Sequence, residues 1–190
     1  MTITREANEL RIQQGNIFAD IDCIVSAAII NGEPSISKIP YKYVVVMSQD
    51  CDLEQDHRVR FTDGANNMDK LLTNVIVVPM YNYEHFIRGN HLADLQMKMA
   101  DHFLSEKKSP NKELRSNNNP RYHYLEFDKS TLIVNSVVDF KHFFTVGINY
   151  LYGIMEDSRK YTIDILYRER LSQRFADYLS RIGLPDGTTE

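Results

Sequence analysis

The chain begins with a loosely alternating segment that leads into an apolar one. Residues 10–21 alternate between apolar and polar side chains, and residues 23–30 are almost entirely apolar. This pattern predicts one or two β-strands, because a period of two places every second side chain on the same face of a sheet. The dipeptide Asn31-Gly32 follows, and it is the strongest short-range signal for a tight hairpin turn.

Two β-branched runs predict the centre of the sheet. Residues 41–47 contain three consecutive valines, and residues 74–80 contain the run Val-Ile-Val-Val. Such nearly continuous apolar runs are typical of strands that are buried on both faces. We expect Pro34 and Pro40 to bound the segment before the first of these strands, and Pro79 to end the second.

A helical pattern and a polar segment separate these strands from the later ones. In residues 91–104 apolar side chains recur at helical spacing after Asn90, a candidate N-cap, so we expect a helix here. Residues 107–120 contain Pro110 and end in Asn-Asn-Asn-Pro, which predicts an exposed loop. The two segments form an insertion over about residues 84–119.

After the insertion the chain returns to strand patterns and ends in a helix. Period-two patterns predict strands at residues 121–127, 131–134 and 136–146. From Asp164 the apolar side chains follow a helical stripe, which comprises Leu171, Phe175, Tyr178, Leu179 and Ile182. We therefore expect a β-rich domain over residues 1–153 and a C-terminal helical extension over residues 154–190 packed on it.

Composition and charge restrict the class of protein. The chain has 190 residues, 43% of them hydrophobic, and a formal net charge of -4, so it can bury the core of one domain, and bulk charge disfavours nucleic-acid binding. No apolar run approaches the roughly 20 residues that cross a bilayer. Two cysteines, Cys23 and Cys51, are too few for a disulfide framework. We expect a cytoplasmic protein that does not associate with membranes.

Four of the strand patterns, in this order, resemble the PemK/MazF-type barrel, the SH3-like fold of many bacterial toxin nucleases. They are Gln-Gly-Asn-Ile at residues 14–17, Tyr-Val-Val-Val-Met-Ser at 43–48, Asn-Val-Ile-Val-Val-Pro-Met at 74–80, and the run from Ser-Val-Val to Thr-Val at 136–146. The resemblance covers about half of the chain. It implies an α+β fold, namely a small SH3-like β-barrel with a helical insertion and a C-terminal helix.

The resemblance also implies a function. Residues 22–40 contain no arginine, and Tyr81-Asn82-Tyr83 follows the strand that contains Pro79, so the chain departs from the toxins where their chemistry is located. What is implied is a divergent relative that binds nucleic acid or a partner protein in a bacterial antiphage-defence or mobile-element module. Residues 48–53 also resemble a Ser-Gln-x-Cys-Asp motif of uncharacterised bacterial proteins, which implies no activity.

The same motif supplies the candidate catalytic residues, which are Asp50, Cys51, Asp52 and His57. A thiol becomes a nucleophile when a nearby base or cation lowers its pKa, but flanking carboxylates oppose thiolate formation. Acidic residues at every second position from 50 to 56 would instead suit a divalent cation if this segment were extended. The alternative interpretation is structural, with Asp50 in turn hydrogen bonds and Cys51 as a small buried side chain.

No metal or cofactor can be identified from the sequence. Its six histidines have no His-x-x-x-His spacing, and its two cysteines have no Cys-x-x-Cys spacing, which are the groupings expected of a zinc site. Any metal site would have to be assembled by the fold.

Candidate nucleic-acid-binding residues lie on a late strand and on the C-terminal helix. They are Arg121, His123, Arg170, Arg174 and Arg181. Cations beside aromatic rings can hold phosphates and stack bases. The alternative is that Tyr122 and Tyr124 pack in the core, that Arg121 and His123 face solvent, and that the helical arginines form a solvated surface.

Three functions stay open at this point. The first is binding of nucleic acid or a partner protein by a divergent toxin-type barrel. The second is a metal-assisted nuclease or hydrolase that uses the loop at Asp50, Cys51 and Asp52, with His57 or His123 as a base. The third is a non-catalytic subunit of a larger assembly, in which the tail helix or the insertion contacts another chain. The oligomeric state is not determined by the sequence.

Overall fold

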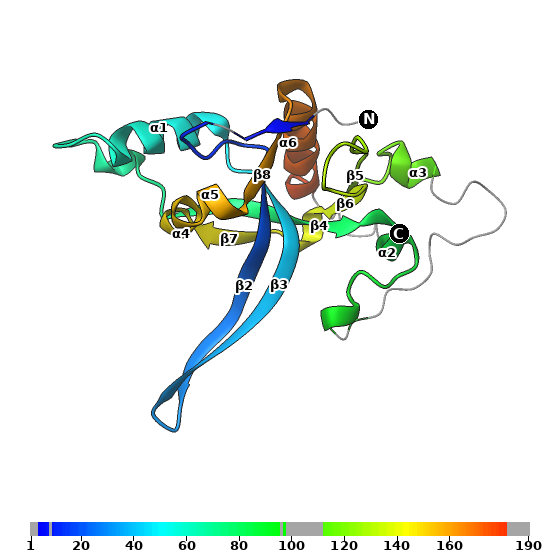
Figure 1. The fold of residues 1–190 in the computed structure, drawn as a ribbon, viewed down its shortest axis with the longest axis horizontal. Coiled ribbons are helices and arrows are strands. Elements are labelled where there is room, and N and C mark those ends of the chain that lie inside the picture. The colour runs from blue at the N-terminus through cyan, green and yellow to red at the C-terminus, as the bar shows by residue number, and fades with distance from the viewer. Residues whose placement is uncertain (1–3, 8, 96, 98–111, 182–190) are drawn as a thin grey trace, which may run out of the picture.

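The structure is a computed structural model, and it describes residues 4–7, 9–95, 97 and 112–181. Its fold is mixed α+β, with one antiparallel sheet of eight strands and helices on both sides (Figure 1). The strands are β1 (Thr4–Glu6), β2 (Asn16–Ile30), β3 (Glu33–Val46), β4 (Asn74–Asn82), β5 (Tyr122–Leu125), β6 (Ser136–Asp139), β7 (Phe144–Gly147) and β8 (Arg159–Ile163). The α+β class expected from the sequence is confirmed.

Six α-helices occur in the described residues. They are α1 (Asp50–Arg60), α2 (Tyr83–Ile87), α3 (Lys112–Arg115), α4 (Ile148–Gly153), α5 (Met155–Ser158) and α6 (Ile165–Leu179). Short 3₁₀ turns lie at Met68–Lys70, Ala93–Leu95 and Phe140–His142. Within the described ranges, none of the helices is both long enough and apolar enough to cross a bilayer.

The sheet has the strand order β1-β8-β2-β3-β4-β6-β5, with β7 paired to β4. The described strands do not close into a barrel, because β1 pairs with β8 alone and β5 with β6 alone, which leaves both edges of the sheet open. Strand β4 joins the two halves of the sheet. Its first part pairs with β3 and β7, and its last three residues, after Pro79, pair with β6. Pro79 therefore lies inside the strand and does not end it.

The valine run in β3 is buried on both faces, as predicted. Val45 lies in one core layer with Phe140 and Phe175, whereas Val44 and Val46 lie in a second layer on the opposite face, as the period of two requires. Helix α6 covers the first layer through Leu171 and Phe175. The second layer includes Leu53 of α1, and Ile148 and Leu151 of α4. A third cluster gathers aromatic side chains of β4, α2 and β5.

Strands β2 and β3 form a long hairpin whose outer half projects from the body as a two-stranded ribbon (Figure 1). We call residues 23–39 the arm. Asn31 and Gly32 form the predicted turn, with φ angles of 54° and 85° and Ile30 paired to Glu33 across it, which is the geometry of a two-residue type I′ hairpin. Both prolines that were expected to bound the segment before the valine run lie inside β3, which starts at Glu33, with Pro34 in the arm and Pro40 just beyond its inner end.

Other differences from the expected elements have local reasons. Residues 50–60 form α1 and are not extended. Residues 131–134 form no strand; Thr131 Oγ1 bonds to the carbonyl groups of Asp128 and Ile133 in a local turn. The C-terminal helix starts after Asp164, as predicted, and the Asp164 carboxylate accepts from the Leu166 N–H. Most of the helix expected over residues 91–104 lies outside the described residues.

Phe140 joins α6 to the sheet and should be among the most costly core residues to truncate. Its ring is fully buried, and its centroid lies 5.5 Å from that of Phe175 and 5.9 Å from that of Tyr178. We expect Phe140→Ala to lower the free energy of unfolding by about 3 to 5 kcal/mol, measured by chemical denaturation. Leu132→Ala is the matched control, because Leu132 is 83% exposed, and a similar loss in both variants would contradict this account of the core.

Candidate functional site

Asp50, the first residue of α1, is held by two arginines. Its carboxylate accepts from Arg11 Nη1 and Nη2 at 3.1 and 3.0 Å and from the Gln14 N–H at 3.1 Å, and Arg168 Nη1 lies 3.6 Å away. Burial works to raise the pKa of Asp50, but the bonds from Arg11 and Gln14 outweigh it, so the pKa lies below its usual value. Asp50 therefore ties α1 and α6 to the segment that precedes β2.

The left-handed glycine at the start of β2 makes room for this cluster. Gly15 has a φ of 84°, and a Cβ added there would lie 3.1 Å from Cγ and Cδ of Arg168. A side chain at position 15 would therefore be strained in its backbone and would crowd the arginine that faces Asp50. Glycine at position 15 thus has both a conformational and a packing reason.

The other residues of the motif do not join Asp50 in a common site. Cys51 is exposed, and its Sγ lies 3.6 Å from Gln49 Oε1 and 3.7 Å from Asp52 Oδ1. His57, almost two helical turns further on, contacts Phe61 and lies 3.4 Å from the Tyr152 hydroxyl, and burial lowers its pKa. Cys51 is therefore not the small buried side chain of the structural alternative.

The alternating acidic residues are separated because α1 is a helix. Two residues correspond to about 200° of rotation in a helix, so every second carboxylate points in a different direction. Asp56 is fully buried and binds Arg60 Nη2 at 2.7 Å and the Leu72 N–H at 2.7 Å. In the part of the chain that the structure describes, no three His, Cys, Asp or Glu side chains come close enough to hold a metal ion.

Three of the candidate nucleic-acid-binding residues are paired with groups of the chain itself or buried. Arg121 forms a two-bond ion pair with buried Asp139, at 2.8 and 2.6 Å, and Arg174 donates to the carbonyl groups of Asn119 and Tyr122, at 2.6 and 3.0 Å. His123 is only 4% exposed, so the expectation that it faces solvent is wrong.

Arg170 and Arg181 are the two candidates with exposed side chains. Tyr122 and Tyr124 are buried in the aromatic cluster, which confirms the packing alternative for these tyrosines. The basic surface offered by these five candidates is therefore smaller than their number suggests, although their role remains a prediction.

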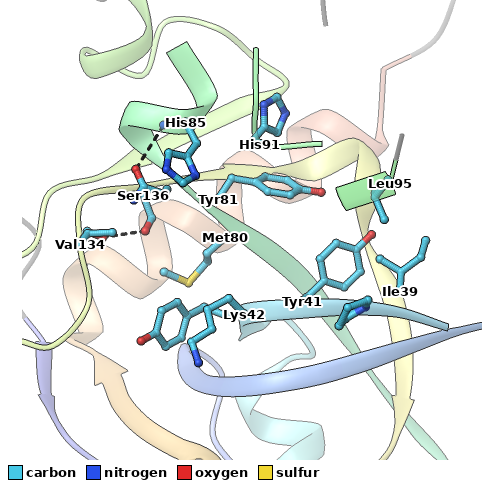
Figure 2. A pocket seen from close by; sticks show the side chains of 13 residues that line it. Ile39, Tyr41, Lys42, Met80, Tyr81, His85, His91, Leu95, Val134 and Ser136 are labelled. Atoms are coloured by element: carbon cyan, nitrogen blue, oxygen red, sulfur yellow. Dashed lines mark hydrogen bonds between the residues drawn. The ribbon is translucent and has the colours of Figure 1, made fainter. Parts of the chain in front are cut away.

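A pocket lies at the base of the arm, between β3, β4 and α2 (Figure 2). Its volume is about 310 Å³. It is lined mainly by aromatic, imidazole and aliphatic side chains, together with the polar residues Lys42, Asn82 and Ser136, and by no carboxylate. Figure 2 shows Tyr41, Tyr81, His85, His91, Met80 and Leu95 among the lining side chains. Such a lining suits a neutral or anionic group better than a cation.

The polar groups behind this pocket are arranged to stay uncharged or paired. The Tyr81 hydroxyl lies 2.8 Å from Nδ1 of His142. Burial raises the pKa of Tyr81 far above its usual value and lowers the pKa of His142, so Tyr81 donates to a neutral imidazole at neutral pH. Asp139, also near His142, is neutralised by Arg121. The protonated hydroxyl of Tyr81 can donate a hydrogen bond, but it cannot take up a proton as a general base does.

The arm carries several large apolar side chains that are exposed. Ile24, Val25, Ile29, Ile30 and Ile36 are between 56% and 79% exposed. At its base the charges are paired across the strands, with Lys38 Nζ 2.5 Å from Asp22 and Lys42 Nζ 2.8 Å from Asp20. The apolar part is therefore confined to the outer segment.

The register gives the outer arm two unlike faces. Cross-strand partners share a face, so Ala27 with Ile36 and Ile29 with Pro34 form one wholly apolar side. The opposite side carries the pairs Ser26 with Ser37, Ala28 with Ser35 and Ile30 with Glu33. Exposed apolar surface of this kind is typical of interaction sites.

Sequence reasoning predicted this hairpin but missed its exposure. The apolar run over residues 23–30 predicts a strand, and this pattern does not indicate that the strand projects from the body. One signal could have indicated the difference, because the run contains alanine, serine and cysteine but no aromatic residue, whereas the buried strands β4 and β5 carry tyrosines.

Comparison of the chain with protein-family profiles, curated proteins and solved structures gives no match.

Asp50 should be a stabilising residue whose contribution depends on pH. Its folded pKa is lower than its ordinary value of 3.8, so its contribution is complete above about pH 4 and is lost as the pH falls through the folded pKa. We expect Asp50→Asn to cost about 1 to 3 kcal/mol at pH 7 and to weaken the acid dependence of unfolding. Exposed Asp52 provides the control, Asp52→Asn, and equal effects in the two variants would refute the role of the Arg11 contact.

His123 should stay neutral well into the acid range. Burial, with help from Arg174 and Arg170, lowers its pKa to about 3. Because the folded pKa is below the ordinary value of 6.5, the stability linked to His123 is complete above about pH 6.5 and declines as the pH falls toward 3. In an NMR titration, its ring signals should not move between pH 8 and 5 in the native protein but should titrate near pH 6.5 in urea. A native midpoint near 6 would contradict the burial.

Proposed function

We propose that this chain is a protein-binding subunit that engages another protein through its arm. The observation that carries the proposal is the projection of residues 23–39 as an apolar ribbon with isoleucines at its tip and middle (Figure 1). Of the functions open from the sequence, this one corresponds to binding of a partner protein within a larger assembly.

The energetics of an isolated ribbon support the proposal. A two-stranded hairpin without a covered face is marginally stable in water, and Ile29 is 79% exposed. Burying apolar surface contributes roughly 25 cal/mol per Å², so a partner that covers this face would stabilise both the arm and the complex. The buried base of the hairpin, at Ile17, Phe18 and Val44 to Val46, holds the arm in place.

The charges favour a protein over a nucleic acid as the partner. A nucleic-acid surface needs cations that are free to neutralise phosphates. The outer arm from Cys23 to Ser37 carries one charged residue, Glu33, and Arg121 and Arg174 are engaged with groups of the chain itself. An uncharged apolar surface instead fits the core of a protein–protein interface.

We retain two further expectations as proposals. The resemblance to the PemK/MazF-type barrel, and with it a bacterial defence or mobile-element setting, rests on the strand patterns and on the bend at Gly15 that opens β2. Cytoplasmic location is supported by the free thiols Cys23 and Cys51, which suit a reducing compartment. Among the described residues of the motif, no arrangement of side chains supports the hydrolase alternative.

The proposal is tested by placing a photo-crosslinking amino acid at Ile29 in the full chain, expressed in the cells that encode it. We expect an adduct that protease removes and nuclease does not, because the arm faces protein. Phe61 is the matched control position, since it is 61% exposed on the body and should give no such adduct.

Two outcomes would contradict the proposal. One is an adduct with nucleic acid at position 29, which would favour the nucleic-acid-binding alternative and direct attention to Arg170 and Arg181. The other is equal labelling at positions 29 and 61, which would mean that the arm has no specific partner.

A further inference from the structure

We infer that the arm binds a second copy of this chain, by antiparallel pairing of the β2 edges of two arms about a two-fold axis. This inference rests on the proposed function, since it identifies the protein that the arm binds. It is carried by the register of the hairpin and by the distribution of proline and charge along its two edges.

Both edges of the arm lack a strand partner in the described ranges. Strand β2 pairs with β8 only at Asn16, Ile17 and Phe18, and β3 pairs with β4 only from Val44 to Val46. Beyond these residues, the N–H and C=O groups that point away from the hairpin are available to another strand.

The β3 edge is blocked to such pairing by its prolines. In a hairpin with a two-residue turn, the two residues that flank the turn form backbone hydrogen bonds with each other. The next cross-strand pair points its N–H and C=O groups outward, away from the hairpin partner. Here Ile30 with Glu33 is the inward pair, so Pro34 lies at an outward position. Pro40 is six residues further along an unbulged strand and has the same orientation. Two outward donors are therefore missing from β3.

The β2 edge is open over its outer part. From Cys23 to Ile30 it contains no proline and no charged residue, although these are usual protections of an exposed edge. Its register shifts between Ile24 and Ser26, so the regular segment that is free to pair runs from Ser26 to Ile30. Ala27 is the cross-strand partner of Ile36, and Ile29 that of Pro34, so Ala27 and Ile29 are the outward residues of β2. The chain protects one edge of its arm and leaves the other available.

The properties of the β2 edge specify what binds it. A complementary strand must be extended, uncharged and apolar, and it must have a free edge of its own. The two end strands of the sheet do not meet these requirements. Strand β1 spans only three residues, which include Arg5 and Glu6, and the residues of β5 are all buried. Strand β2 of a second copy meets every requirement, and a two-fold axis gives both copies the same contact.

Antiparallel pairing also covers the exposed tip. The five residues from Ser26 to Ile30, beyond the register shift of β2, span about 17 Å, and pairing about an axis at Ala28 brings the outward residue Ala27 of each copy opposite Ile29 of the other. Ile29 and Ile30, which are 79% and 56% exposed, would then lie against the arm of the second copy. The ion pair of Lys38 with Asp22 marks the inner limit of the uncharged segment.

The test compares proline on the two edges of the same cross-strand pair. Ala27→Pro removes an outward donor from β2, and Ile36→Pro removes the outward donor opposite it on β3. Sedimentation velocity of the full chain over a wide concentration range should show a monomer–dimer equilibrium. We expect Ala27→Pro to weaken it about tenfold or more, since two symmetry-related bonds are lost, and Ile36→Pro to leave it within twofold.

A second pair of variants keeps the inference testable if proline disturbs the hairpin. Ala28→Lys and Ser35→Lys place the same charge on β2 and on β3 within one cross-strand pair. The β2 lysine should weaken dimerisation more than the β3 lysine, because it stands at the paired edge. Equal effects of the two lysines, or of the two prolines, would overturn pairing through β2.

Failure of this inference can be told apart from failure of the proposed function. If the wild-type chain stays monomeric at every concentration while position 29 crosslinks to a different protein, the arm binds a partner but the second-copy inference is wrong. If the chain is monomeric and position 29 gives no protein adduct, both are wrong.

Discussion

The pairing of β2 with β3 is the interaction on which the rest of the structure depends. At its inner end it contributes to both core layers, since Ile17 and Val45 face α6 and Phe18 and Val44 face α1 and α4. At its outer end the same ladder continues without cover. The register shifts once, between Ile24 and Ser26, and on either side of this point it determines which side chains share a face, because a slip of one residue would exchange the two faces.

Short sequence signals were sufficient to predict an element where the residues concerned strongly favour one conformation. Asn31-Gly32 specified the turn, consecutive valines specified a strand buried on both faces, and Asp164 specified the start of α6. Prediction failed where tertiary contacts decide. Residues 50–60 have a polar, weakly patterned sequence, and they form a helix whose start is tied to Arg11 through Asp50 and whose Leu53 reaches the core.

The candidate site was harder to predict, because a sequence does not show which charged side chains pair within the fold or which apolar segments the fold leaves exposed. Arg121 and Arg174 suggested an anion surface, yet the chain uses both to bind its own Asp139 and its own carbonyl groups. The apolar run of β2 predicted a strand, but not that this strand is exposed from Ile24 to Ile30. Such assignments require knowledge of which segments meet, and the spacing of residues does not contain it.

The most direct test of the account is residue-resolved hydrogen exchange of the arm amides at low and at high protein concentration. If the arm is the binding element and β2 its bonding edge, the amides of Ala27 and Ile29 should become protected as the concentration rises, while that of Ile36, opposite Ala27 in the ladder, should exchange at the same rate throughout. Fast and concentration-independent exchange at all three positions would contradict the account, because no second strand would then be bound.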